Sequence, residues 1–344
     1  MTPMNNPDSI ADNCRAQTQR GWALNRVSRL LFSGLTIGIA AGAANAQEYP
    51  VKPVRIIVPY TAGGGSDLLG RLAAKKLGEA FGQQVIVENR PGAGGNIGAD
   101  AIAKAAADGY TLGIVPSTHA IAPGLYPRLP FDPIRDFTFI TLIASGPNIL
   151  VCHPSLPAKS VKELIALAKR RPGELTFASA GVGTSTHLFG EYFKGEAGID
   201  VVHIPYKGSS QAEVDLVGGQ VSFMIDSMPS ALPRVQAGRL RALATTGKKR
   251  FAALPDVPTL LEAGLAYETT SWWGIVGPAG LPQPVVNKLL AEITRFMALP
   301  DVKQFVATQG AEPATGTPQQ FQEYVKQETA LYAKIIKTAN IHLE

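Results

Sequence analysis

Short apolar runs alternate with longer amphipathic stretches along much of this chain of 344 residues. The runs at 54–58 and 85–87 are rich in β-branched residues, which favours strands. Between them, residues 67–81 carry apolar side chains at helical spacing. A glycine-rich turn at 89–98, an alanine-rich helix ending at 107 and a strand at 111–115 follow. This alternation predicts an α/β fold in which helices cover both faces of a parallel sheet.

The second part of the chain repeats this order of elements. Ser160 is expected to cap a helix that ends at Arg170, and Glu163 completes a capping box. Further strands are predicted at 175–178, 201–204, 221–225 and 240–245, and further helices from Thr184 or Ser185 to Lys194 and at 211–218, 284–297, 301–309 and 318–338. A chain of this length exceeds what one core usually supports, so two domains are expected.

The first 46 residues have the composition of a cleavable secretory signal. Four arginines precede an apolar run at 30–41, and small residues then end in Ala44-Asn45-Ala46. The apolar run is shorter than the ~20 residues that a membrane span needs. We expect cleavage after Ala46 and a periplasmic protein that begins at Gln47. The alternative is an uncleaved helix that anchors the N-terminus.

Charge and cysteine content change once this signal is removed. Four arginines and two aspartates leave, so the net charge falls from +5 to +3, and no long Lys/Arg run follows. Binding of nucleic acid is therefore not expected. Cys14 leaves as well, so Cys152 has no partner for an internal disulfide. No histidine pair has metal-ligand spacing and there is no cysteine cluster, so a metal site is not expected. No cofactor is expected either.

Two glycine-rich turns each follow a predicted strand and precede a helix, at 63–66 and 181–185. The first N–H groups of a helix lack internal partners and the helix dipole adds positive charge there, so each turn can hold an anion. One such turn in each half would suit a carboxylate held between two domains. The alternative is ordinary capping by Ser66, Thr184 or Ser185. Neither turn, nor the one at 89–98, has nucleotide-binding spacing, and the latter could face the ligand or only lead into a helix.

Three ionisable residues lie near these turns. Asp67 can cap its helix, order the first turn, or meet an ammonium group of an amino-acid ligand. Asp226 ends a predicted strand, where it could lie near the ligand. His187 follows the second turn and could donate to a ligand. It could also act as a base for Ser185, although no G-x-S-x-G motif accompanies the pair.

The sequence resembles the Bug-type periplasmic receptors of tripartite tricarboxylate transporters. The matching stretches include YPVKPVRIIVPYTAGGGSD (49–67), VIVENRPGAGGNIGADAIAKAAADGYTL (85–112), FASAGVGTSTHL (177–188), GGQVSFMIDSMPSALP (218–233) and SWWGIVGPAGLP (271–282). The resemblance implies a class II periplasmic-binding-protein fold, with two α/β lobes, a ligand cleft between them and two crossovers. We expect the first lobe at 47–147 and 270–344 and the second at 148–269. A core or hinge role is favoured for Trp272 and Trp273, near the return to the first lobe.

The resemblance also implies how a ligand is held. The two glycine turns would grip one carboxylate, largely through backbone N–H groups and ordered water, with an aromatic residue at the ligand's far end. Thr61-Ala62 stand where the family often has proline, which bears on ligand identity. The implied ligand-binding residues are Tyr60, Gly64, Gly65, Ser66, Asp67, Ser117, Gly183, Thr184, Ser185, His187 and Asp226.

We therefore expect a receptor that is not an enzyme. It would capture a di- or tricarboxylate, an acidic amino acid or an aromatic carboxylate, close by hinge motion, and deliver the ligand to membrane transporter subunits. A monomer is expected. Two alternatives stay open, a receptor that feeds a sensor system and a hydrolase that uses Ser185 and His187 on the same scaffold.

Overall fold

The computed structural model describes residues 49–338 and residue 341. The predicted signal sequence and its cleavage site lie outside these residues. The strands are β1 (Val54–Val58), β2 (Val85–Asn89), β3 (Thr111–Pro116), β4 (Phe137–Cys152), β5 (Thr176–Ser179), β6 (Val202–Pro205), β7 (Phe223–Ser227), β8 (Arg241–Thr245), β9 (Thr270–Pro278) and β10 (Glu312–Pro313). The helices are α2 (Gly65–Phe81), the 3₁₀ turn η1 (Ala93–Gly95), α3 (Asn96–Ala103), α4 (Thr118–Leu125), α5 (Val161–Arg170), α6 (Ser185–Ala197), α7 (Ser209–Val217), α8 (Met228–Gln236), α9 (Gln283–Met297), α10 (Pro300–Thr308) and α11 (Pro318–Thr338).

The strands form a mixed sheet in the order β2-β1-β3-β9-β4-β7-β5-β6, with β8 and β10 also paired to β4. As predicted, β1 pairs in parallel with β2 and β3, and β5 pairs in parallel with β6 and β7. The expectation of a purely parallel sheet is wrong, because β4 and β9 are antiparallel to each other and to their other neighbours. Strand β9 returns from β8 without a helix between them and enters antiparallel between β3 and β4, which run in the same direction.

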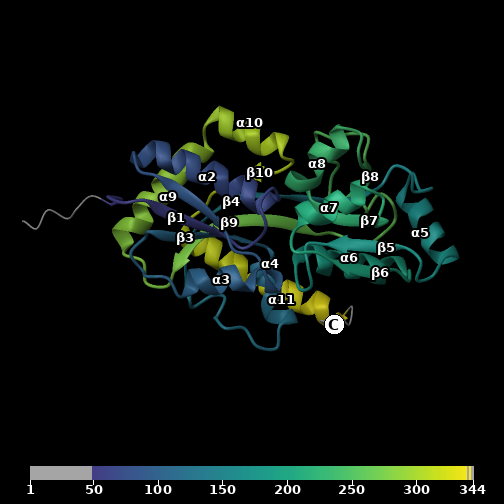
Figure 1. Cartoon of the computed structure of the whole chain (residues 1–344), viewed down its shortest axis with the longest axis horizontal. Helices are drawn as coiled ribbons and strands as arrows, with labels where there is room; N and C mark the ends of the chain where they lie inside the picture. Colours follow the sequence, from purple (N-terminus) through teal and green to yellow (C-terminus); the bar gives the residue numbers. More distant parts are fainter. Residues whose placement is uncertain (1–48, 339–340, 342–344) are drawn as a thin grey trace, which may run out of the picture. The chain divides into compact units, whose positions relative to one another are not determined.

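Two groups of elements lie toward the two ends of the sheet, and we use the name lobe for each. The first lobe is defined as β1–β3, β9, β10, α2–α4 and α9–α11, and the second as β5–β8 and α5–α8. Helices lie on both sides of the sheet in each lobe (Figure 1). This is the two-lobe α/β architecture that the sequence predicts.

Strand β4 runs through both lobes. Its residues from Phe137 to Pro147 pair with β9, and those from Asn148 to Cys152 pair with β7 and β8 (Figure 1). On the return path, Thr270 of β9 pairs with Pro147. The change of partners thus falls beside the expected crossovers, and the division of the chain at 147 and 270 stays a prediction.

Two local predictions from the sequence are seen in the structure. The Ser160 hydroxyl accepts a hydrogen bond from the backbone N–H of Glu163 at the start of α5, as expected of a helix cap. Trp272 is fully buried, and its indole N–H donates to the Glu328 carboxylate over 3.1 Å. The core role expected for Trp272 is therefore confirmed.

Candidate ligand-binding site

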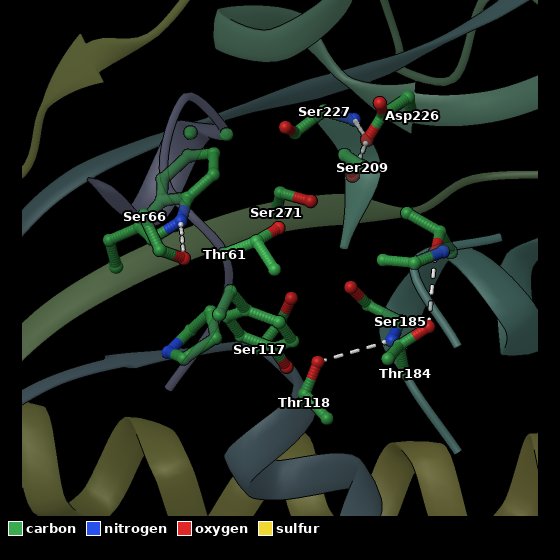
Figure 2. A pocket seen from close by; sticks show the side chains of 17 residues that line it. Thr61, Ser66, Ser117, Thr118, Thr184, Ser185, Ser209, Asp226, Ser227 and Ser271 are labelled. Carbon is green, nitrogen blue, oxygen red and sulfur yellow. Dashed lines mark hydrogen bonds between the residues drawn. The ribbon is translucent and has the colours of Figure 1, made fainter. Parts of the chain in front are cut away.

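The N-termini of five helices, α2, α4, α6, α7 and α8, meet around one small pocket between the lobes (Figure 2). The space left inside is about 50 Å³, which suits one or two water molecules. The pocket is lined by Tyr60, Thr61, Gly64, Gly65, Ser66, Pro116, Ser117, Thr118, Ala180, Thr184, Ser185, Thr186, Ser209, Asp226, Ser227, Ser271 and Trp273.

The first glycine turn brings the start of α2 to the pocket. Gly63 has a φ of 88°, a left-handed conformation that favours glycine, and Gly64 is the N-cap without a side-chain bond. Ser66 does not cap this helix. Its hydroxyl oxygen instead accepts a hydrogen bond from the Trp273 indole N–H over 3.1 Å (Figure 2). Because that bond uses only the oxygen, the Ser66 hydroxyl proton is left to donate to a ligand.

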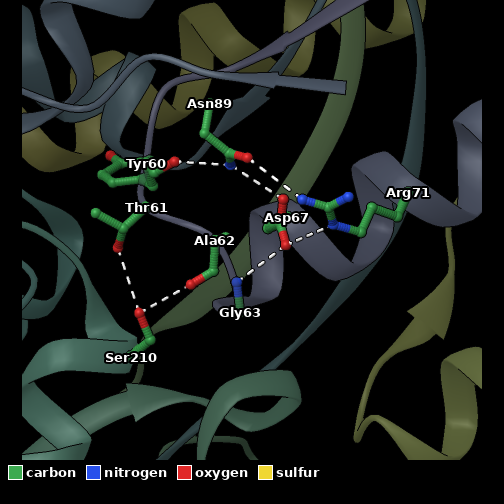
Figure 3. Close-up of polar contacts among 8 residues, drawn as sticks. All are labelled: Tyr60, Thr61, Ala62, Gly63, Asp67, Arg71, Asn89 and Ser210. Atoms are coloured by element: carbon green, nitrogen blue, oxygen red, sulfur yellow. Dashed lines mark hydrogen bonds and ion pairs between the residues drawn. The ribbon is translucent and has the colours of Figure 1, made fainter. Parts of the chain in front are cut away.

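Asp67 stands behind this turn and is not part of the pocket lining. Its carboxylate accepts from the backbone N–H of Gly63, from Arg71 Nε and from Asn89 Nδ2, over 2.8–3.0 Å (Figure 3). Burial alone would raise the pKa of Asp67, but these hydrogen bonds and the Arg71 charge hold it below its usual value. The contacts support the interpretation that Asp67 orders the glycine turn.

The second glycine turn brings α6 to the opposite wall. Thr184 caps this helix, since its hydroxyl oxygen accepts from the backbone N–H of His187 over 3.3 Å. The next residue, Ser185, donates its backbone N–H to the Thr118 hydroxyl over 3.1 Å. Gly183, with a φ of 77°, packs against Tyr126 and does not line the pocket. Thr184 and Ser185 therefore reach the pocket, and Gly183 shapes the turn.

His187 also supports this turn from behind. It is buried outside the pocket lining, its Nδ1 accepts a hydrogen bond from the Gly183 N–H, and its ring stacks on His203 at 4.3 Å between centroids. Burial lowers the pKa of His187 to about 4, so its imidazole is neutral near pH 7. With Nδ1 used in this way, the side chain holds the loop in place.

Asp226 lines the pocket from β7 and is fully buried. Its Oδ1 atom accepts from the Ser209 hydroxyl over 2.8 Å and from the Ser227 N–H over 2.7 Å (Figure 2). Burial raises the pKa of Asp226 to about 6. The residue thus fixes the serines at the starts of α7 and α8.

The charge of the lining indicates what the pocket can hold. Serine and threonine dominate it, and no Lys, Arg or His is present in it. Its positive potential comes from helix N-termini, which bind anions through backbone N–H groups. The Ser117 hydroxyl is buried and lacks a hydrogen-bond partner within the described residues. Buried hydroxyl groups ordinarily have a hydrogen-bond partner. The Ser117 hydroxyl is therefore available to donate a hydrogen bond to an acceptor in the pocket.

Direct contacts join the two lobes around the pocket. The Tyr126 hydroxyl donates to the Val182 carbonyl over 3.1 Å. The Ser210 hydroxyl lies 3.3 Å from the Thr61 hydroxyl and donates to the Ala62 carbonyl over 3.0 Å (Figure 3). These hydrogen bonds hold the two lobes together beside the glycine turns, next to the small pocket.

The structure brings eight of the eleven predicted residues to the lining, and Asp67, Gly183 and His187 lie outside it. Sequence reasoning missed several lining residues, namely Thr61, Thr118, Ser209, Ser227, Ser271 and Trp273. The sequence favours a core or hinge role for Trp273, and the structure shows that this residue is both buried and part of the pocket wall. A polar pair after a strand, as in Ser117-Thr118, is a helix-start signal that could have located α4.

Neither a membrane-spanning helix nor a metal-binding cluster is found within the described part of the chain. No helix there is long and apolar enough to cross a membrane. No group of three or more His, Cys, Asp or Glu side chains among those residues is arranged to hold a metal ion.

Comparison with known proteins gives the same picture over most of the chain. Residues 69–341 match the family model described as tripartite tricarboxylate transporter family receptor. The protein BugT of Bordetella pertussis is 38% identical over 326 residues, which cover 93% of this chain and 100% of BugT.

Two similar solved structures contain ligands. The structure of Rpa4515 from R. palustris with adipate is 39% identical, with a TM-score of 0.84, and the match covers 86% of this chain and 99% of that one. MatC from Rhodopseudomonas palustris with bound malate is 30% identical, with a TM-score of 0.81, and the match covers 84% of this chain and 100% of MatC.

Proposed function

The chain belongs to the tripartite tricarboxylate transporter receptor family, and on this premise we propose that it captures a small carboxylate in the pocket between its lobes and delivers it to a membrane transporter. As a member of that family it is a periplasmic-type solute-binding receptor and not an enzyme. The ligand, the partner and the residues that bind the ligand are the parts that we propose.

The meeting of five helix N-termini at a pocket without a basic side chain carries this proposal. Each N-terminus offers unpaired backbone N–H groups and a partial positive charge. A carboxylate is small enough to accept from several of them at once, and charged hydrogen bonds are stronger than neutral ones. We propose that Ser117 and Ser185 add hydroxyl donors, with Gly64, Gly65, Ser66 and Thr184 on the two turns.

The relatives indicate which carboxylates to try first. Rpa4515 was solved with adipate and MatC with malate, and both ligands carry two carboxylates. We propose that one carboxylate sits among the helix N-termini and that the rest of the ligand extends toward Tyr60. Acidic amino acids and aromatic carboxylates are further candidates, because backbone donors recognise the shared carboxylate and not the remainder.

Closure of the lobes would couple capture to delivery. The hydrogen bonds of Tyr126, Ser185 and Ser210 cross between the lobes next to the pocket, so closing and ligand binding would support each other. The membrane partner would then recognise the closed form. We further propose that a monomer carries out this work in the periplasm, after cleavage at Ala46. N-terminal sequencing of exported protein that finds a start far from Gln47 would contradict the cleavage site.

A thermal-shift screen of small carboxylates on ligand-free protein tests the proposal. At about 100 times its Kd, a ligand stabilises the folded state by about 2.7 kcal/mol. We expect at least one mono-, di- or tricarboxylate to raise the melting temperature. The variant Thr118→Val, which removes a pocket hydroxyl, should weaken that shift, whereas Thr294→Val on the exposed face of α9 should not. A broad screen without any shift would contradict the proposal.

A further inference from the structure

Two buried acids lie side by side behind the pocket wall. Glu213 of α7 and Asp226 of β7 are both fully shielded from solvent. Ser209, whose hydroxyl donates to Asp226 over 2.8 Å, lies one helical turn before Glu213 on the same face of α7, so the two acids face the same buried region. Arg234 of α8 is the cation beside them, with its Nη1 atom 2.7 Å from Glu213 Oε2. Two acids therefore share one base in a dry environment, which leaves one negative charge too many if both are ionised.

The hydrogen bonds of this cluster are incomplete. Asp226 Oδ2, both carboxyl oxygens of Glu213 and the Ser230 hydroxyl are buried and accept or donate no hydrogen bond among the residues that the structure describes. Arg234 Nη1 donates to the Ser230 carbonyl over 3.0 Å, and its approach to Glu213 has the distance of an ion pair without the alignment of a hydrogen bond. Buried polar atoms ordinarily have partners. A proton held between the two carboxyl groups would give Glu213 and Asp226 a hydrogen bond to each other.

Among the described residues, no other charged group on the neighbouring elements is directed at the two acids, because the rest are paired, stacked or exposed to solvent. Among the elements packed against α7 and β7, strand β5 carries no ionisable side chain and β4 carries only Cys152. On α7, Asp215 accepts from the Tyr206 hydroxyl over 2.7 Å. On α6, Lys194 pairs with Glu191, His187 stacks on His203, and Glu196 is exposed. The charged group that α8 places beside the two acids is therefore Arg234.

We propose that Glu213 and Asp226 hold one proton between them, and that this proton lets the pocket accept an anion. Asp226 lines the pocket, so its charge would act directly on a bound carboxylate, whereas Glu213 acts through Asp226 as a positioning residue. When the pair keeps its proton, the cluster with Arg234 is neutral. When the proton is lost, a buried negative charge faces the ligand and repels it. This inference rests on the proposed carboxylate-binding function.

The same pair makes the ligand-free protein sensitive to pH. Burial and the neighbouring Asp226 raise the pKa of Glu213 to about 9. An acid whose pKa is raised by folding stabilises the fold below its unfolded pKa, and this contribution is lost as pH rises toward the folded pKa. For Glu213 that window runs from its ordinary value of 4.5 to about 9. Neutral glutamine at position 213 has no such proton to lose.

The first experiment needs no ligand. Thermal unfolding of the wild type, Glu213→Gln and the exposed control Glu174→Gln is measured from about pH 5 to about pH 9. We expect the wild type and the control to lose stability as pH rises, and Glu213→Gln to lose less. Equal pH dependence in all three proteins would overturn the shared proton. If Glu213→Gln does not fold, Asp226→Asn carries the same test.

The second experiment measures adipate binding by calorimetry between about pH 7 and about pH 10, where a carboxylate ligand is fully ionised. Two buffers of different ionisation enthalpy report the protons taken up. Because the pKa of Glu213 is about 9, we expect wild-type affinity to fall as pH rises toward and above that value, by up to about tenfold per pH unit, with up to one proton taken up on binding. Glu213→Gln should bind with a flatter pH profile and without proton uptake.

Each outcome of this second experiment has a distinct meaning. Binding of adipate with the same pH profile and no proton uptake in wild type and variant would overturn the coupling. Failure of adipate and of every other carboxylate to bind at any pH would overturn the proposed function, and the coupling with it. The ligand-free unfolding experiment would still decide on the shared proton by itself.

Discussion

The backbone N–H of Ser185 donates to the hydroxyl oxygen of Thr118 over 3.1 Å, and both residues are the first of a helix, α6 and α4. The bond joins the second lobe to the first at the edge of the pocket. Two helix N-termini, each with unpaired N–H groups, are thereby held next to each other. Their partial positive charges are thereby directed to one place, and this arrangement supports the proposal of a carboxylate ligand.

Replacement of Thr184 and of Ser185 should separate capping from binding. Thr184→Ala removes the cap of α6, so we expect it to lower the free energy of unfolding by about 0.5–2 kcal/mol. Ser185→Ala removes a hydroxyl from the pocket and no cap, so we expect little loss of stability and about tenfold to hundredfold weaker carboxylate binding. Thermal melts and calorimetry on both variants check this. Unchanged affinity in a folded Ser185→Ala protein would remove that hydroxyl from the binding site.

A side chain at Gly183 should disrupt closure. A Cβ atom there would lie 2.3 Å from the Tyr126 hydroxyl, and the φ of 77° disfavours other residues. Gly198→Ala is the matched control, because Gly198 also has a positive φ of 57° but open space around its Cβ position. We expect Gly183→Ala to weaken carboxylate binding far more than Gly198→Ala does, in calorimetry on folded protein. Equal effects would mean that backbone strain, and not contact with Tyr126, is responsible.

Gly208 offers a test of lobe closure that does not depend on backbone strain. Its φ of 161° is extended, yet an added Cβ would lie 2.0 Å from the Thr61 hydroxyl of the other lobe. We expect Gly208→Ala to keep its melting temperature in the absence of ligand and to bind carboxylate more weakly. The double variant Thr61→Ala/Gly208→Ala should recover part of the affinity, because the clashing oxygen is gone. A double variant as weak as Gly208→Ala would exclude this contact as the cause.

Asp67 should stabilise the protein in a pH-dependent way. Its pKa is held below the ordinary value of 3.8, so its contribution is present above that value and is lost as pH falls through the lower, folded pKa. Asp67→Asn should therefore lower the melting temperature clearly at pH 7 and much less in strong acid. An equal effect at both pH values would show that the charge on Asp67 is not what orders the glycine turn.

Local sequence patterns predict the elements that can be recognised from their own residues, without reference to the segments that pack against them. Helix α11 begins and ends at the expected residues, because its apolar periodicity is complete within the helix itself. Strand β4 was not predicted, since Gly146-Pro147 in its middle has the local character of a turn. Its pairing with β9 and β7, which are distant in sequence, overrides that local preference.

The sequence predicts where the glycine turns of the candidate site lie, but not which side chains around them reach the pocket. The glycine turns carry a local signal, so the start of α2 and of α6 could be located from sequence. Position near a turn does not tell which way a side chain points, and Asp67 and His187 face away from the pocket. Thr118, Ser209 and Ser227 come from three separate elements and reach the pocket only through folding.

The most direct test of the central claim compares a carboxylate with its own neutral amide. Calorimetry on the ligand-free wild type would measure adipate, adipamide and every carboxylate that raises the melting temperature, each with its amide. Since hydrogen bonds to a charged group contribute about 1.5–3 kcal/mol each, we predict that at least one acid binds and that its amide binds at least about tenfold more weakly. Amides that bind as tightly as the corresponding acids, or no binding by any acid, would contradict a carboxylate receptor.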